Sequence, residues 1–238
     1  MTNQKLAQEI VKSDGVKTLL HSDVYIRLGK VMHNLELRLL NHPILDLIGN
    51  LEPAIFFVGQ YLHFAADIPR ITGLRYGLCQ DEETRRRLLS VMIEEDGYYL
   101  EAEVPRQSHY SLAKVTARSL GVETEPNIHV GTSTMLSALE MQYKSCLISG
   151  LASSYAREGI YPKLMPKIAE QLSKACPSVD TIFFDVHAVG DIEHSQAALE
   201  CICQLCSADD LPTVEKSVYL GLGALLAWYD SLCMELKC

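Results

Sequence analysis

The sequence predicts an all-α protein, a single-domain helical bundle of about seven to nine helices. Three observations lead to this prediction. Apolar residues recur at helical spacing through most of the chain, no stretch has the strict alternation of a half-buried strand, and the breaks between helical stretches are short. We find no internal repeat and no long linker, so we expect one domain over residues 1–238, with 1–15 as a loose N-terminal segment.

Prolines and glycines divide the first half of the chain. Residues 16–40 have the spacing of a helix, which Pro43 ends because the residue before a proline avoids the helical conformation. A short helix over 44–50 and an apolar helix over 54–67 follow, and Pro69 ends the second of them. We expect a linker over 71–78 and then a helix over 81–97, which opens on acidic residues and stops at Gly97.

The second half is also helical by its spacing. A helix begins at Pro105 or Ser108 and ends at Gly121, a residue suited to the left-handed conformation that closes helices. A long helix over 135–158 contains many small residues, and Pro162 opens a separate helix over 162–175. The remaining helices are predicted from residue 178 or 180 to 206, and over 214–236.

The composition of the chain limits the classes of function that it can have. The chain has 238 residues, 48% of them hydrophobic, and a net charge of −9. It is therefore long enough for one substantial core, and its charge opposes nucleic-acid binding. There is no secretory leader and no apolar stretch of about 20 residues without charges, so we expect a cytoplasmic protein that does not enter a membrane. In that setting the eight cysteines are expected to be free thiols.

His187, Asp191 and His194 form the most informative polar pattern. On a helix these side chains fall at roughly 0°, 40° and −20°, which is one narrow stripe. Two imidazoles and a carboxylate on one stripe suit iron, manganese or zinc. A solvated polar face is the alternative, but polar groups buried among apolar neighbours need partners. The apolar neighbours here are Ile182, Phe183, Phe184, Val186, Val189 and Ile192.

A metal site inside a bundle needs further ligands from facing helices. Glu94 and Glu95, together with His109 on the following helix, are one source, and Glu158 is another. The alternatives are solvent exposure for Glu94 and Glu95, and for Glu158 a salt bridge with Arg157 or Lys163.

These residues resemble the haem-oxygenase-like di-iron oxidase superfamily, especially its CADD-like members. The pattern His-x3-Asp-x2-His is matched by His187, Asp191 and His194, and Glu158 precedes a proline as in that family. His109 begins a stretch that ends in Leu-Gly, similar to the family's pattern. The resemblance covers about residue 40 to the C-terminus. It implies a haem-oxygenase-like fold and a metal-ligand set of Glu95, His109, Glu158, His187, Asp191 and His194.

The resemblance also implies a chemistry. Carboxylate and imidazole ligands without thiolate suit two iron ions, or iron with manganese, and O₂ as co-substrate. The predicted function is then oxidation of a small organic substrate by a metal-dependent oxidase or oxygenase. We expect the substrate pocket to include Phe57, Tyr61 and Phe64. The family fold also allows the chain to form a homodimer.

One feature departs from the family pattern. Glu95 lies 14 residues before His109, which is about 21 Å on a straight helix and too far for a shared ion. Either the chain breaks at Gly97 and Pro105 so that Glu95 folds back, or the ligand is Glu101 or Glu103. We expect Glu95.

Two other functions remain open. TenA-type thiaminases and the pyrroloquinoline-quinone synthase have the same architecture without this di-metal set, so a metal-free enzyme is the first alternative. A helical interaction protein whose site has decayed is the second. Metal binding distinguishes the first from an oxidase, and reactivity with O₂ distinguishes the second.

Overall fold

The computed structural model describes residues 21–98 and 107–237, and every regular element in those ranges is helical. The elements in chain order are α1 (His21–Leu40), α2 (Ile44–Leu47), α3 (Leu51–Leu78), α4 (Glu82–Glu95), α5 (His109–Ser119), α6 (Val130–Ser145), α7 (Leu147–Ala175), α8 (Ile182–Leu205), the 3₁₀ turn η2 (Ala208–Asp210) and α9 (Leu211–Glu235). The predicted all-α class is confirmed.

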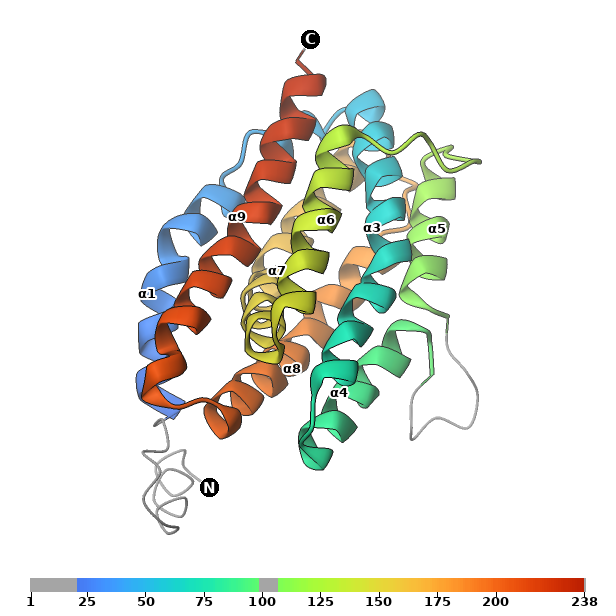
Figure 1. The fold of residues 1–238 in the computed structure, drawn as a ribbon. Coiled ribbons are helices and arrows are strands. Elements are labelled where there is room, and N and C mark those ends of the chain that lie inside the picture. The colour runs from blue at the N-terminus through green and yellow to red at the C-terminus, as the bar shows by residue number, and fades with distance from the viewer. Residues whose placement is uncertain (1–20, 99–106, 238) are drawn as a thin grey trace, which may run out of the picture.

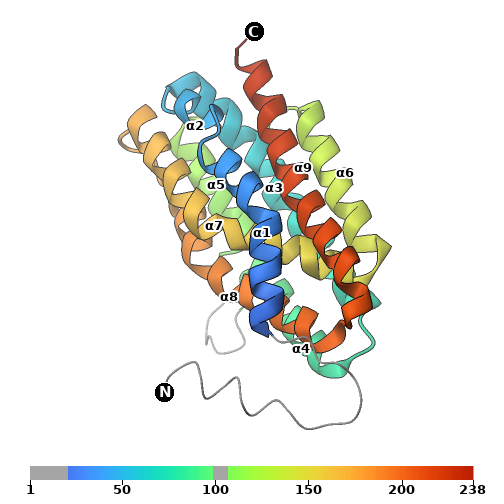
Figure 2. The ribbon, with the colours of Figure 1, turned by 90° about the vertical axis from the view of Figure 1, so that its left-hand side faces the viewer.

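The long helices lie side by side around a common core. α7 contacts α8 and α9 most extensively, and α3 contacts α5 and α6 (Figure 1). α1 lies across α9 on one side, and α4 lies at one end of the bundle beside α3 (Figures 1 and 2). The core between them is apolar and aromatic, with Trp228, Tyr61, Tyr161 and Phe183 among its largest fully buried side chains.

Three predicted boundaries are wrong because prolines do not end their helices. α3 continues through Pro69 to Leu78, so the expected linker at 71–78 is helical. α7 runs through both Pro162 and Pro166, where a separate helix was expected. A proline inside a helix removes one hydrogen bond and bends the helix, and packing on both sides offsets that cost. Figure 2 shows α7 changing direction along its length.

The predicted long helix over 135–158 is also divided differently. α6 ends at Ser145, and Cys146 adopts an extended backbone with φ −167°. Its thiol then accepts a hydrogen bond from the backbone N–H of Ser149, which caps the start of α7. α6 begins at Val130, where the ring of His129 accepts a bond from the N–H of Gly131. The capping groups are therefore a thiol and an imidazole.

The remaining boundaries fall close to their predicted positions. The predicted helix over 16–40 appears as α1, and its first five residues lie outside the described ranges. The short helix predicted over 44–50 ends at Leu47. Seven cysteines lie in the described part of the chain, and all are free thiols as expected.

α9 is the described helix that is long and apolar enough to cross a membrane by length and composition alone. The stretch Ala208–Glu235 has a mean hydropathy of 1.2 in its most apolar window, and 56% of that window is buried in the fold. Its apolar residues pack against α1, α6 and α7, as those of a core helix do.

α7 and α9 approach closely at Gly221, and this contact can be tested. A Cβ atom at Gly221 would lie 3.2 Å from Cα and 3.3 Å from the carbonyl oxygen of Ser153, whereas one at Gly223 would meet nothing within 4 Å. We expect Gly221→Ala to lower the free energy of unfolding by about 1–3 kcal/mol through overpacking. Gly223→Ala should instead raise it by up to ~1 kcal/mol through helix propensity. Urea unfolding measures both, and equal effects would contradict the close approach.

Candidate metal centre

α8 places the predicted stripe inside the protein. His187, Asp191 and His194 have exposed fractions of 7%, 3% and 7%. Nδ1 of His187 donates a hydrogen bond of 2.7 Å to the carbonyl oxygen of Phe183. This bond fixes the tautomer and orients the ring, as commonly seen for metal-binding histidines, and leaves Nε2 available.

The apolar surroundings of the stripe are only partly as expected. Phe183 and Phe184 are buried beside it, but Val189 and Ile192 are 70% and 57% exposed. The inward face of α8 is therefore narrow. The polar stripe lies on that face because α7 packs against it along most of its length.

Glu95 lies at the site, although it is 14 residues from His109 in the sequence. α4 ends there because Gly97 adopts φ +83°, a conformation that glycine permits. The N–H groups of Gly97 and Tyr98 bond back to the carbonyls of Glu94 and Ile93, which closes the helix end. Glu95 Oε2 then lies 2.7 Å from Nδ1 of His109. Glu101 and Glu103, the alternative ligands, lie outside the described residues.

His109 is the first residue of α5. Ser108 begins this helix by accepting a hydrogen bond from the N–H of Ser111. Carboxylates at the negative end of α4 and a histidine at the positive end of α5 both oppose the helix dipoles. Such local conflicts concentrate at functional sites, and here the two unfavourable charges neutralise each other.

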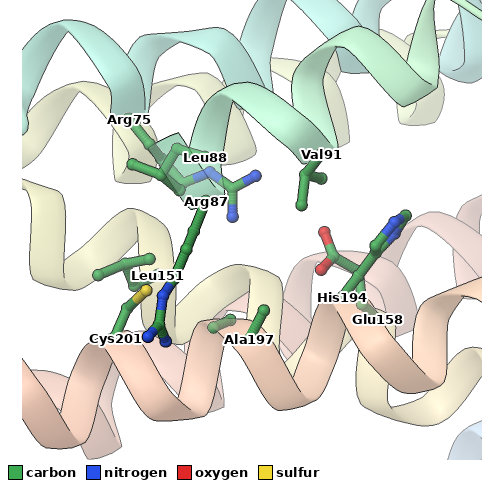
Figure 3. Close-up of a pocket in the computed structure, with 10 residues that line it drawn as sticks. Arg75, Arg87, Leu88, Val91, Leu151, Glu158, His194, Ala197 and Cys201 are labelled. Carbon is green, nitrogen blue, oxygen red and sulfur yellow. The ribbon is translucent and has the colours of Figure 1, made fainter. Parts of the chain in front are cut away.

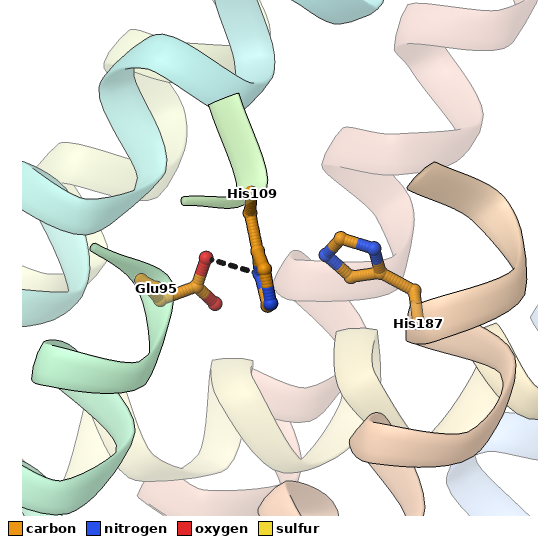
Figure 4. Close-up of side chains that lie close together, drawn as sticks. All are labelled: Glu95, His109 and His187. Carbon is orange, nitrogen blue, oxygen red and sulfur yellow. Dashed lines mark ion pairs between the residues drawn. The ribbon is translucent and has the colours of Figure 1, made fainter. Parts of the chain in front are cut away.

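Three of the ligand candidates come together directly. One ligand atom from each of Glu95, His109 and His187 lies within 4.8 Å of the other two, and all three side chains are buried (Figure 4). The rings of His109 and His187 are 4.5 Å apart between centroids. Helices α4, α5 and α8 thus each contribute one group to a single point, as a metal site in a bundle requires.

The other predicted ligands extend this group along α8. Nδ1 of His194 lies 3.3 Å from Oδ1 of Asp191, and its Nε2 lies 3.1 Å from Oε2 of Glu94. Glu94 is half-buried on the last turn of α4. It belongs to the carboxylates expected to face the stripe, although the ligand set that the family resemblance implies leaves it out.

Glu158 is present at the site but already has a partner. It is 3% exposed on α7, and its Oε1 accepts bonds from Nη2 of Arg157 at 2.8 Å and from Oγ of Ser154 at 2.9 Å. The salt bridge with Arg157 is therefore formed, while Lys163 pairs with Glu36 instead. Glu158 and His194 line one small cavity together (Figure 3).

Two buried polar atoms of this site lack a hydrogen bond. Oδ2 of Asp191 and Nδ1 of His109 are buried, and neither has a hydrogen-bond partner among the described residues. Leaving a buried carboxylate oxygen without a partner is costly. A cation bound at Oδ2 of Asp191 would remove that cost, and carboxylates and imidazoles are donors that suit such an ion, so the donor set fits a metal centre.

The charged groups of the site shift one another's pKa values. Burial disfavours both ionised forms, but the Glu95–His109 contact lowers the pKa of Glu95 and raises that of His109. Burial likewise opposes the charged form of His194, yet its bonds to Asp191 and Glu94 raise its pKa. Burial lowers the pKa of His187 and keeps it neutral, the form that binds metals.

The expected pocket residues lie in the aromatic core beside the site, where the ring centroid of Tyr61 is 6.0 Å from that of Phe183, which in turn is 4.5 Å from that of His187. Phe57, Tyr61 and Phe64 are at most 2% exposed and pack in the aromatic core with Trp228 and Tyr229. The cavity beside Glu158 is lined by other residues, from α3, α4, α7 and α8. Aromatic side chains at helical spacing suit both a core and a pocket wall, so a substrate pocket at these three residues stays a prediction.

Solved structures share this fold at low sequence identity. A CADD-like protein of unknown function from Nostoc punctiforme has 18% identity and a TM-score of 0.71, over 90% of this chain and 100% of that one. A TenA homologue from Pseudomonas syringae has 12% identity and a TM-score of 0.70, over 94% and 99%. A domain with a haem-oxygenase-like fold from Shewanella denitrificans has 15% identity and a TM-score of 0.64, over 92% of each chain.

No curated protein matches the chain. The family model described as iron-containing redox enzyme matches residues 55–229, a range that includes every residue of the candidate metal centre. The chain therefore belongs to the iron-containing redox enzyme family.

Proposed function

We propose that this protein is a metal-dependent oxidase or oxygenase. It binds two transition-metal ions, iron with iron or iron with manganese, and uses O₂ to oxidise a small organic substrate. The observation that supports the proposal best is the group of Glu95, His109 and His187, buried and within 4.8 Å of one another. The family match supports the choice of iron.

The residues divide between two positions. Glu95, His109 and His187 would hold one ion, and Glu158 and His194 would hold the other. Asp191 would be shared between the two positions, because it follows His187 by one turn of α8 and its Oδ1 lies 3.3 Å from Nδ1 of His194. Bound there, two such ions would supply the electrons that reduce O₂.

Neighbouring residues position these ligands through hydrogen bonds. Phe183 orients His187 through its carbonyl, and Arg157 with Ser154 holds Oε1 of Glu158 so that Oε2 is available. Close packing of α7 on α8 keeps bulk water from the buried ligands. We expect the first position to bind its ion more tightly, because Arg157 competes for Glu158 at the second.

The test is metal stoichiometry after anaerobic loading with Fe(II), followed by absorbance on adding O₂. We expect about two irons per chain at saturation and an O₂-dependent band, both reduced or lost in His187→Ala. His33→Ala is the matched control, because His33 is exposed on α1 and should leave both readouts unchanged.

Other outcomes would revise the proposal. One iron per chain would restrict the site to the Glu95, His109 and His187 position. No iron in the native protein would contradict the oxidase and favour a metal-free enzyme, the alternative supported by the TenA homologue with the same fold. Bound iron without any reaction with O₂ would favour a binding protein.

A further inference from the structure

Arg75 on α3 is a buried cation without an acidic partner. It is 2% exposed, and no carboxylate among the described residues lies within ion-pair distance of it. Its Nε donates to the carbonyl oxygen of Thr72 at 3.2 Å, and Nη1 donates to Oγ of Ser154. A guanidinium has five N–H groups, so three of them donate to no described residue. Burying an unpaired charge is costly.

The surrounding residues hold Arg75 in this position. A Cβ atom at Gly150 on α7 would lie 2.9 Å from Cγ of Arg75, so glycine leaves the room that its side chain occupies. The guanidinium lies 5.3 Å from the centroid of the Tyr143 ring, and the hydroxyl of Tyr143 shares Ser154 at 2.7 Å. The position of Arg75 is therefore fixed by packing on three helices.

The free side of the guanidinium faces the cavity beside the metal centre. Figure 3 shows Arg75 directed into the space bounded by Leu88 and Val91 of α4, with Glu158 and His194 on the far wall. The cavity has a free volume of about 10 Å³, room for roughly one water molecule. A carboxylate group has three heavy atoms and is larger than one water molecule, so binding it requires the cavity to widen between α4 and α8.

The charges around the cavity favour an anion. Glu158 is already paired with Arg157, and Arg87, which also lines the cavity, is paired with Glu83 and Glu200. Arg75 thus remains as the one cation of this wall that lacks an acid in the described structure. A planar guanidinium with free N–H groups matches a carboxylate, which it binds through two parallel hydrogen bonds.

We propose that Arg75 binds the carboxylate group of a small organic acid, and that this acid is the substrate oxidised at the metal centre. The second half of the statement rests on the proposed function, and the first half does not. Arg75 would hold the acid at one end of the cavity while Glu158 and His194 lie at the other, so the carbon next to the carboxylate faces the metal ligands.

The test uses the full chain, first freed of metal and then loaded with Zn(II), which is redox-inactive and diamagnetic. The probe is sodium formate, the smallest carboxylate, with binding followed by the line width of ¹³C-formate and by the melting temperature. Sodium chloride and sodium nitrate at equal ionic strength and formamide, uncharged and of similar shape, are the comparison solutes. We expect formate to raise the melting temperature more than any of them.

Variants locate the binding. Arg75→Met should weaken formate binding by about tenfold or more, because two charge-assisted hydrogen bonds are lost. Arg118→Met, at an exposed arginine of α5, is the matched control and should bind like the native protein. Arg75→Met should fold at least as stably as the native chain without formate, since it removes an unpaired buried charge. Arg75→Lys keeps the charge but lacks the planar guanidinium, so its affinity for formate should lie between those of the native chain and Arg75→Met. It replaces Arg75→Met in the test if that variant does not fold.

Three results would overturn the proposal: equal formate binding by Arg75→Met and the native chain, equal responses to formate and chloride, or no response to formate. Its failure is distinguishable from that of the proposed function. Formate binding through Arg75 with no iron uptake would retain a carboxylate site and remove the oxidase. Iron uptake without formate binding would do the reverse.

Discussion

Glu158→Leu should destabilise the metal-free protein by about 3–5 kcal/mol, because it leaves Arg157 buried without its acid. Arg157 is 3% exposed, and Glu158 is its only carboxylate partner among the described residues. Replacing one member of a buried pair removes the attraction between the charges but keeps the cost of burying the other. Chemical unfolding in urea, with chelator present, measures the loss.

The double variant Arg157→Met/Glu158→Leu separates this cause from simple loss of packing. Apolar residues of similar volume often replace a buried ion pair at no cost, so we expect most of the lost stability to return. Both variants should bind fewer metal ions, since both lack Glu158. If the single variant loses less than about 1 kcal/mol, Arg157 is hydrated and the pair contributes little.

Trp228→Ala should also cost about 3–5 kcal/mol, the range for truncating a large buried aromatic residue. Trp228 on α9 is 1% exposed, and its ring centroid lies 4.9 Å from that of Tyr61 and 5.7 Å from that of Phe64. Its Nε1 donates to Oγ1 of Thr132 at 2.9 Å, so the substitution also removes a buried hydrogen bond. For a chain of this size each kcal/mol lowers the melting temperature by about 2–4 °C.

Met234→Ala is the control on the same helix. Met234 is 64% exposed, so its truncation should change stability by less than about 0.5 kcal/mol. Iron stoichiometry should be unchanged in both variants, because neither residue contacts the candidate ligands. Loss of iron in a folded Trp228→Ala protein would instead place the aromatic cluster at the functional site, as the expected pocket of Phe57, Tyr61 and Phe64 implied.

The sequence contains enough information for the fold class and for the stripe on α8, because both depend on residue spacing along one helix. His187, Asp191 and His194 share a face whenever that stretch is helical. The prolines were misleading for a physical reason. Pro69, Pro162 and Pro166 remove backbone donors, but packing between helices distant in sequence decides whether the helix continues.

Glu95 and Glu158 depend on tertiary structure. The distance from Glu95 to His109 follows from how α4 ends at Gly97 and where α5 begins, which spacing along one straight helix could not give. Arg157 precedes Glu158 directly, so their pairing was an open alternative. Arg75 has no local signal, because nothing in its own stretch shows that it meets Ser154 across the bundle.

The sparse anchoring of α4 has a mechanical consequence. Only Thr84, Leu88 and Glu95 of this helix are buried, whereas α7 buries residues along almost its whole length. An ion held jointly by Glu95, His109 and His187 would therefore act as a cross-link that fastens a weakly attached helix to two firmly packed ones. A substitution at Glu95 would then both remove a ligand and loosen α4 as a whole, so the affinity for the ion and the rigidity of this end of the bundle would change together.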